Sequence, residues 1–216
     1  MTLTEKQLGC QLSNAEVVWN PFNIDYKASP SWPALGSNGE LRLACVARLD
    51  PAFKGQDILL EALSTREWAT RNWRLYLYGE GPVRNVLEQL VQHFGLSRRV
   101  FFAGHRPVEE IWASNHVLVI PSRAEGLPLA IVEAMLCARP VLTTDVAGNS
   151  EIVEDGVTGF LADAPTVRSV GNALERLWAN RANIEAMGKA GAKKIRELVP
   201  PDPVRQFTDK IESLLH

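Results

Sequence analysis

The segment that decides the fold is residues 117–135, VLVIPSRAEGLPLAIVEAM. An apolar run of β-branched character, 117–120, leads into a loop rich in Pro, Ser and Gly. Pro128 then opens a stretch of good helix formers, so the segment predicts a strand, a loop and a helix. Unpaired backbone N–H groups and the positive end of the helix dipole meet in such a loop, which suits an anion.

Two glutamates flank this loop. Glu125 lies in the loop and Glu133 in the predicted helix. Eight helical steps would separate them by about 12 Å, which is the size of a small ligand. The alternative is that Glu125 complements the helix dipole as a first-turn acid and Glu133 is a solvated helix residue. Spacing alone leaves both interpretations open.

The composition is that of an ordinary globular protein. The chain has 216 residues, 46% of them hydrophobic and 22% charged, with a formal net charge of -2. This charge gives no reason to expect nucleic acid as a partner. No apolar run approaches the length of a membrane span, and residues 1–9 lack the apolar core of a signal peptide. Three cysteines without metal-like spacing agree with a cytoplasmic protein.

Apolar strand patterns alternate with helical patterns from residue 41 onward. The predicted strands are 41–47, 73–78, 100–102, 117–120, 140–143 and 160–161. The predicted helices are 56–63, 82–94, 109–114, the one opening at Pro128, 166–180, 183–197 and 204–215. This alternation predicts an α/β fold, a single Rossmann-like, doubly wound parallel sheet of about six strands with helices on both faces. Before it, we expect a short helix over 4–12, a brief strand over 17–19 and a linker over 26–39.

Ligands of doubly wound sheets bind outside the carboxyl ends of the strands. Arg48 follows the first predicted strand, and Lys54 lies just beyond the turn at 50–53, so both side chains could reach one anion. Each of them could equally be a solvated surface residue. The loops after the other strands are 79–81, 104–106, 121–128 and 145–149.

Several common sites are missing from the sequence. Gly79-x-Gly81 lacks the spacing of the dinucleotide fingerprint, and no Walker-type phosphate loop is present. No Asp-x-Asp pair is available to hold a divalent metal against a diphosphate, and the four histidines lack ligand spacing. Ser122 has no nucleophile-elbow context. We therefore predict no metal site, and any charge on a leaving group must be met by Arg, Lys and backbone amides.

The motifs together resemble one family. They are, in order, Arg48-Leu49-Asp50-x-x-x-Lys54-Gly55, Tyr78-Gly79-Glu80-Gly81-Pro82, Phe102-x-Gly104, Pro121-Ser122-x-x-Glu125-Gly126-Leu127-Pro128 with Glu133-Ala134-Met135, Pro140-Val141, and Gly148-Asn149-x-Glu151 to Gly159-Phe160. From residue 41 to the end, the chain resembles the C-terminal, donor-binding domain of the retaining glycosyltransferase family four (group 1 type), which has the GT-B fold.

This resemblance implies a nucleotide-sugar site with catalytic roles for Glu125, Arg48 and Lys54. The two cations would hold the diphosphate and stabilise it as leaving group, and Glu133 would accept hydrogen bonds from the ribose hydroxyls. The donor-binding residues would be Arg48, Lys54, Gly104, Arg106, Glu125, Gly126, Leu127, Pro128 and Glu133. The implied substrate is a nucleoside-diphosphate hexose, such as a UDP- or GDP-sugar, with no cofactor and no metal required.

The resemblance also bears on domains and partners. Residues 1–38 resemble a linker and the remnant of the connection to an N-terminal acceptor domain, and 39–216 the donor-binding domain. The implied partners are that acceptor domain and a glycan or lipid acceptor, in polysaccharide or glycolipid assembly, with a peripheral contact at the inner face of the cell membrane left open. Asn149 stands where the family commonly has a second glycine. The alternatives are a stand-alone nucleotide-binding or regulatory module and half of a nucleotide-sugar epimerase.

Overall fold

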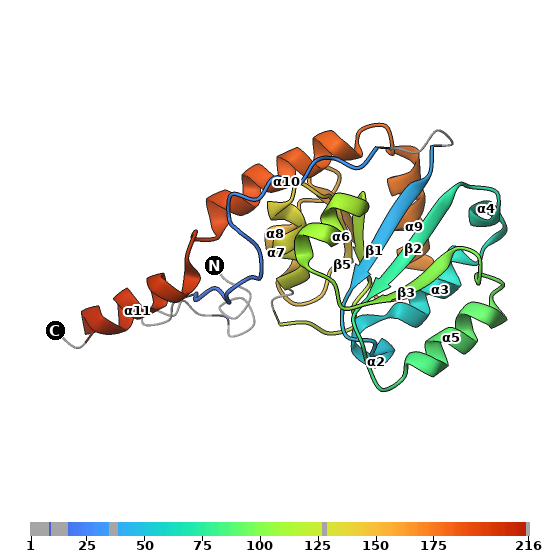
Figure 1. Cartoon of the computed structure of the whole chain (residues 1–216), viewed down its shortest axis with the longest axis horizontal. Helices are drawn as coiled ribbons and strands as arrows, with labels where there is room; N and C mark the ends of the chain where they lie inside the picture. The colour runs from blue at the N-terminus through green and yellow to red at the C-terminus, as the bar shows by residue number, and fades with distance from the viewer. Residues whose placement is uncertain (1–8, 10–16, 35–38, 127–128, 215–216) are drawn as a thin grey trace.

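A six-stranded parallel sheet forms the centre of the protein (Figure 1). The structure is a computed structural model that describes residues 9, 17–34, 39–126 and 129–214. The strands are β1 (Leu41–Val46), β2 (Trp73–Tyr78), β3 (Val100–Gly104), β4 (Val117–Ile120), β5 (Val141–Thr144) and β6 (Gly159–Ala162). Their order in the sheet is β3-β2-β1-β4-β5-β6. Strands β2 and β3 are added on one side of β1, and β4 to β6 are added on the other. The strand order therefore reverses between β1 and β4, and ligands of such sheets bind at this switch point.

Helices cover both faces of the sheet, as the sequence predicts. The helices are α2 (Pro51–Lys54), α3 (Gln56–Leu63), α4 (Arg66–Ala69), α5 (Arg84–His93), α6 (Val108–Ser114), α7 (Leu129–Leu136), α8 (Asn149–Ile152), α9 (Val167–Ala179), α10 (Ile184–Leu198) and α11 (Pro203–Leu214). Side chains of α3, α5 and α9 share one buried cluster with the sheet, those of α6 and α7 share a second, and α10 contributes to both. The α/β, doubly wound architecture is confirmed.

The strongest apolar patterns in the sequence predicted the ends of strands and helices most accurately. The predicted ranges for β2, β4 and α3 agree with the structure residue for residue. Sequence analysis missed α2, α4 and α8, each of which has four residues and therefore too little periodicity to detect. The strand predicted over 17–19 is wrong, because these residues have no strand pairing and Val17 and Val18 are exposed. The helix predicted over 4–12 lies outside the described residues, except for residue 9.

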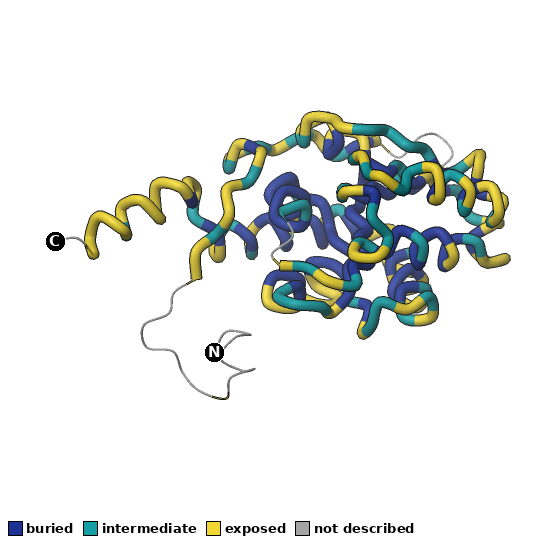
Figure 2. The backbone as a smooth tube through the Cα atoms, turned by 90° about the horizontal axis from the view of Figure 1, so that it is seen from below, coloured by how far each residue is buried: buried dark blue, intermediate teal, exposed yellow. Residues whose placement is uncertain are grey.

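Two segments lie outside the sheet and the helices that cover it. Residues 17–34, here called the strap, run along the face formed by α6, α7 and α10. Helix α11 projects away from the body, and its described residues are exposed apart from the buried Pro203 and the half-buried Lys210 (Figure 2). Its large apolar side chains, Val204, Phe207, Ile211 and Leu214, are all exposed. Within the part of the chain that the structure describes, no helix is both long and apolar enough to cross a membrane.

Candidate donor-binding site

A cleft of about 720 Å³ opens at the carboxyl ends of β1, β2 and β3. Arg48, immediately after β1, forms one of its walls, and Glu133 from α7 forms another. The loop after β3 contributes Gly104, His105 and Arg106. The other lining residues are Asn23, Val46, Ala47, Tyr78, Gly79, Glu80, Pro107, Val108, Glu109 and Ile111. The cleft therefore lies where a doubly wound sheet is expected to bind its ligand.

A second hollow of about 390 Å³ adjoins the first at Arg48, which lines both. Its other lining residues are Asp50, Phe53, Lys54, Ala124, Glu125 and Gly126. The two hollows form one groove along the carboxyl edge of the sheet. This groove has Glu133 and the β3 loop in one part and Lys54 and Glu125 in the other.

The short helix α2 places Lys54 beside the loop after β4. Pro51 starts this helix, and Gly55 ends it with φ of 66°, in the left-handed region where glycine carries little strain. A Cβ on Gly55 would lie 2.0 Å from the carbonyl oxygen of Pro121. A glycine is therefore required here for the β1 and β4 loops to approach this closely.

Lys54 and Glu125 form an ion pair in the smaller hollow. Lys54 Nζ lies 2.8 Å from Glu125 Oε1 and 2.7 Å from Oε2. The Glu125 side chain is only 5% exposed and that of Lys54 is 25% exposed. Ser122 Oγ also donates a hydrogen bond to Glu125 Oε1. The structure thus brings together two residues that the sequence assigned separately to the ligand, and each now neutralises the other.

The loop that carries Glu125 is fastened to the elements around α2. Arg123 forms a bidentate ion pair with Asp57, at 2.6 and 2.8 Å, and donates to the carbonyl oxygen of Pro51. The backbone N–H groups of Arg123 and Ala124 both donate to the carbonyl oxygen of Phe53. These two amides are therefore occupied by the protein, and ligand contacts from this loop must come from residues further along it.

Glu133 is a buried carboxylate with polar partners from the strap. It is 5% exposed, and its Oε1 accepts hydrogen bonds from the backbone N of Asn23, at 2.9 Å, and from Asn23 Nδ2, at 3.3 Å. Burial raises the pKa of Glu133, the two Asn23 hydrogen bonds oppose this rise, and Glu109 adds to it. Glu133 is thus a hydrogen-bond acceptor in the wall of the larger cleft, which contradicts its reading as a solvated helix residue.

The sequence model of a family described as "Glycosyl transferases group 1" matches residues 40–180, which include both hollows apart from Asn23. The chain belongs to this family.

Similar proteins agree with this assignment. A GDP-mannose-dependent alpha-(1-6)-phosphatidylinositol monomannoside mannosyltransferase of Mycolicibacterium smegmatis is 32% identical over 159 residues, which cover 69% of this chain and 41% of that enzyme. The alpha-D-kanosaminyltransferase of Streptomyces kanamyceticus is 33% identical over 129 residues, 58% of this chain and 33% of that enzyme. The chain therefore spans less than half the length of these two relatives.

Solved glycosyltransferases share the fold. The structure of HepE from Anabaena, determined in complex with UDP and glucose, has a TM-score of 0.79 and 25% sequence identity, covering 96% of this chain and 59% of that one. The C-terminal domain of a glycosyl transferase group 1 family protein from Francisella tularensis has a TM-score of 0.66 and 20% identity. The match covers 80% of this chain and 96% of the Francisella tularensis domain. The domain described here is therefore the equivalent of one half of a GT-B enzyme.

Most residues predicted for the glycosyltransferase site line the groove. Arg48, Lys54, Gly104, Arg106, Glu125, Gly126 and Glu133 all do so. Leu127 and Pro128 lie outside the described residues. Gly79 also lines the larger cleft and packs tightly against the end of β1: its φ is 122°, and a Cβ there would lie 2.2 Å from the carbonyl oxygen of Ala47.

Asn149 and Asn23 make contacts that the family motifs do not predict. Asn149 is fully buried and donates from Nδ2 to Thr143 Oγ1 and to the carbonyl oxygen of Thr144, both at 3.0 Å, so it braces the end of β5. Asn23 belongs to the groove, but the resemblance placed it in the segment 1–38 that connects to the acceptor domain. Its contact with Glu133 joins residues 110 positions apart, which no local pattern reveals.

No cluster of metal ligands accompanies these residues. Across 17–34, 39–126 and 129–214, the structure brings together no group of three or more His, Cys, Asp and Glu side chains suited to a metal ion. The cations at the groove are those of Arg48, Lys54 and Arg106.

Proposed function

We propose that this chain is the donor-binding domain of a retaining, metal-independent glycosyltransferase that transfers a hexose from a nucleoside-diphosphate sugar to a glycan or lipid acceptor. The observation that carries this proposal is the groove. It presents a buried carboxylate, an exposed Arg48 and the Lys54–Glu125 pair one after another along the carboxyl edge of the sheet. A nucleoside-diphosphate sugar has hydroxyls, phosphates and a sugar in a matching order.

Each part of the donor has a chemical counterpart in the groove. Ribose hydroxyls are hydrogen-bond donors and suit the Glu133 carboxylate, whereas a diphosphate suits Arg48 and Lys54. When the bond between the anomeric carbon and the diphosphate oxygen breaks, negative charge develops on the diphosphate. Cations already in place stabilise that charge without metal. The solved complex of the 25% identical HepE with UDP and glucose supports a donor of this class.

The Lys54–Glu125 pair changes how the donor must bind. Lys54 Nζ has both Glu125 oxygens within 2.8 Å, so a diphosphate that uses Lys54 has to share it with Glu125 or replace it. Glu125 is then directed toward the sugar by Ser122, which remains hydrogen-bonded to Oε1. In this arrangement the Glu125 carboxylate accepts a hydrogen bond from a sugar hydroxyl close to the anomeric carbon. Donor contacts near Gly126, Leu127 and Pro128 would complete this end of the site.

Calorimetric titration with UDP, GDP and their uridine and guanosine nucleosides tests the proposal. We expect Arg48→Ala to weaken diphosphate binding by about 1.5–3 kcal/mol, the size of a charge-assisted hydrogen bond, with little effect on the nucleoside. Arg98→Ala is the matched control, because Arg98 is exposed and lies in the turn before β3, at the amino end of the strands.

Three results would contradict the proposal. Binding of neither diphosphate would exclude a donor site and favour a regulatory module. Equal loss of diphosphate and nucleoside affinity in the Arg48 variant would mean that Arg48 acts through the fold. Affinity that appears only with Mg²⁺ and disappears in EDTA would refute metal independence.

A further inference from the structure

Asn23 is the one strap residue that lines the larger cleft. It donates two hydrogen bonds to a single oxygen of Glu133, from its backbone N at 2.9 Å and from Nδ2 at 3.3 Å. The residue lies outside the range 40–180 that the family model matches. A segment beyond the matched domain therefore reaches into the groove and contacts its buried carboxylate.

The two carboxylate oxygens of Glu133 differ in their hydrogen bonds. A carboxylate oxygen offers about two lone pairs to hydrogen-bond donors, so the two Asn23 donors occupy Oε1. Among the described residues, the structure gives Oε2 no hydrogen-bond partner, and Oε2 is not sealed from the cleft. Two acceptor positions on Oε2 thus remain for a ligand, which matches a pair of neighbouring hydroxyl groups.

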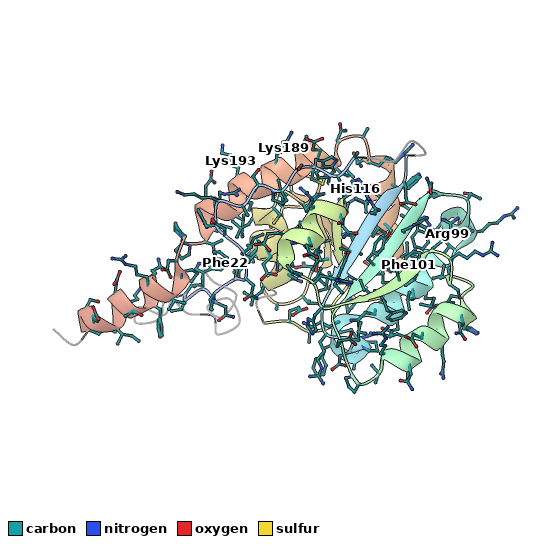
Figure 3. The ribbon with its side chains drawn as sticks, in the orientation of Figure 1. Phe22, Arg99, Phe101, His116, Lys189 and Lys193 are labelled. Atoms are coloured by element: carbon teal, nitrogen blue, oxygen red, sulfur yellow. The ribbon has the colours of Figure 1, made fainter. Side chains whose placement is uncertain are left out.

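The strap is held firmly enough to fix Asn23. Ile24 beside it is buried, and Tyr26 donates from its hydroxyl to the carbonyl oxygen of Arg196 at 2.8 Å. Further along, Arg139 donates to the carbonyl oxygen of Ser31 at 2.7 Å, and His116 Nε2 lies 3.1 Å from that of Pro33. In Figure 3 the label of Phe22 locates the strap residue next to Asn23, and that of His116 locates the residue in contact with Pro33. These contacts, all on the C-terminal side of Asn23, hold the strap against the domain.

We propose that Asn23 is a positioning residue of the donor site, which holds Glu133 by Oε1 so that Oε2 accepts hydrogen bonds from the 2′- and 3′-hydroxyls of the donor's ribose. This inference rests on the proposed function. Asn23 acts through Glu133 and confers selectivity for ribose. Without it, the Glu133 carboxylate rotates and its two oxygens no longer hold fixed positions in the cleft.

The hydrogen bonds from Asn23 act against the net electrostatic setting of Glu133, in which the pKa is raised. Burial raises the pKa of the carboxyl, and the neighbouring Glu109 raises it further, so both favour the protonated form. The hydrogen bonds from Asn23 favour the ionised form instead. An ionised carboxylate only accepts hydrogen bonds, which is what two ribose hydroxyls require.

The test compares ribose-containing and hydroxyl-free ligands. Calorimetry gives the dissociation constants of UDP and GDP and of their 2′,3′-dideoxy analogues, and the ratio within each pair measures recognition of the hydroxyls. Asn23→Asp puts a carboxylate against Glu133 and should reduce the ratio about tenfold. Asn23→Ala keeps the backbone hydrogen bond, so we expect a reduction of about threefold. Asn183→Ala is the control, because Asn183 is exposed and its side chain caps no helix amide.

The outcomes separate this inference from the proposed function. Wild-type protein that binds neither diphosphate overturns both. Wild-type protein that prefers the ribose form, with the same preference in Asn23→Asp and Asn23→Ala, overturns only the role of Asn23. Tighter binding of UDP or GDP by Asn23→Ala also overturns it, because Asn23 would then occupy the place of the ribose. Equal losses for ribose and dideoxy ligands would assign Asn23 a purely structural role.

Discussion

Mild acid should weaken the fold through His116, which is fully buried immediately before β4. Its Nδ1 accepts a hydrogen bond from the backbone N of Arg42 at 2.9 Å, so Nε2 carries the proton that is directed at the Pro33 carbonyl oxygen. Burial, with smaller effects from Arg42 and Arg139, lowers the pKa of His116 from 6.5 to about 4. The folded protein therefore keeps His116 neutral at a pH where the unfolded chain binds a proton.

The sign and size of the effect follow from these two pKa values. A lowered folded pKa gives stability that is complete above pH 6.5 and is lost as the pH falls toward 4. Linkage with pKa values of 6.5 and about 4 gives a loss of about 2 kcal/mol between pH 7 and pH 5. Asp155 and Glu175, whose pKa values are lowered, lose their contributions at more acidic pH. The raised pKa of Glu133 acts in the opposite direction and stabilises the fold as the pH falls.

Urea unfolding followed by tryptophan fluorescence measures this loss at pH 7, 6 and 5. His116→Gln removes the titrating group. The two proteins keep the same carboxyl groups, so the difference between their plots of unfolding free energy against pH reports on His116 alone. We expect the wild-type free energy of unfolding to fall by about 2 kcal/mol more than that of the variant. If the two pH profiles run parallel, His116 does not carry a depressed pKa, and the reasoning is refuted.

Two further predictions concern the ion pair of the site and the projecting helix. Lys54→Met should cost about 2 kcal/mol of unfolding free energy because it leaves the nearly buried Glu125 without its cation, and adding Glu125→Gln should recover about 1 kcal/mol. Strictly additive losses in urea unfolding would show that the pair is not coupled. Removing residues 203–216 should cost less than about 1 kcal/mol, because Pro203 is the only described α11 residue that is buried. A fall in Tm of more than about 4 °C would contradict this.

Local patterns were enough to predict the sheet and most of its helices. The apolar runs of β2 and β4 and the regular spacing in α3 are properties of a few adjacent residues, and their bounds agree with the structure. The same reasoning failed at residues 17–19, where two exposed valines resemble a strand but have no neighbouring strand to pair with. Sequence shows a tendency to form a strand, whereas pairing depends on what lies beside it.

The site was predictable as a set of residues but not as a set of contacts. Arg48, Lys54, Glu125 and Glu133 follow from motif spacing and lie on one groove. The hydrogen-bond and ion-pair partners of these side chains do not follow from motif spacing, because the sequence analysis assigned every candidate to a ligand. Spacing along the chain cannot show that Lys54 pairs with Glu125 across 71 residues. The contact between Asn23 and Glu133 is longer still, and it depends on the strap lying across the completed fold.

The strap also has a consequence for the order of events during synthesis. Tyr26 bonds to a residue 170 positions further along the chain, and closing so long a loop delays the contact. At about 5–20 residues per second, translation takes on the order of ten seconds or more to produce Arg196 after Tyr26. During this time the apolar side chain of Ile24 has no finished surface to cover it. A nascent chain in which β1 to β5 have already formed could therefore place Asn23 against Glu133 but would still lack the contact between Tyr26 and α10, so the last anchor of the strap forms only after Arg196 has been made.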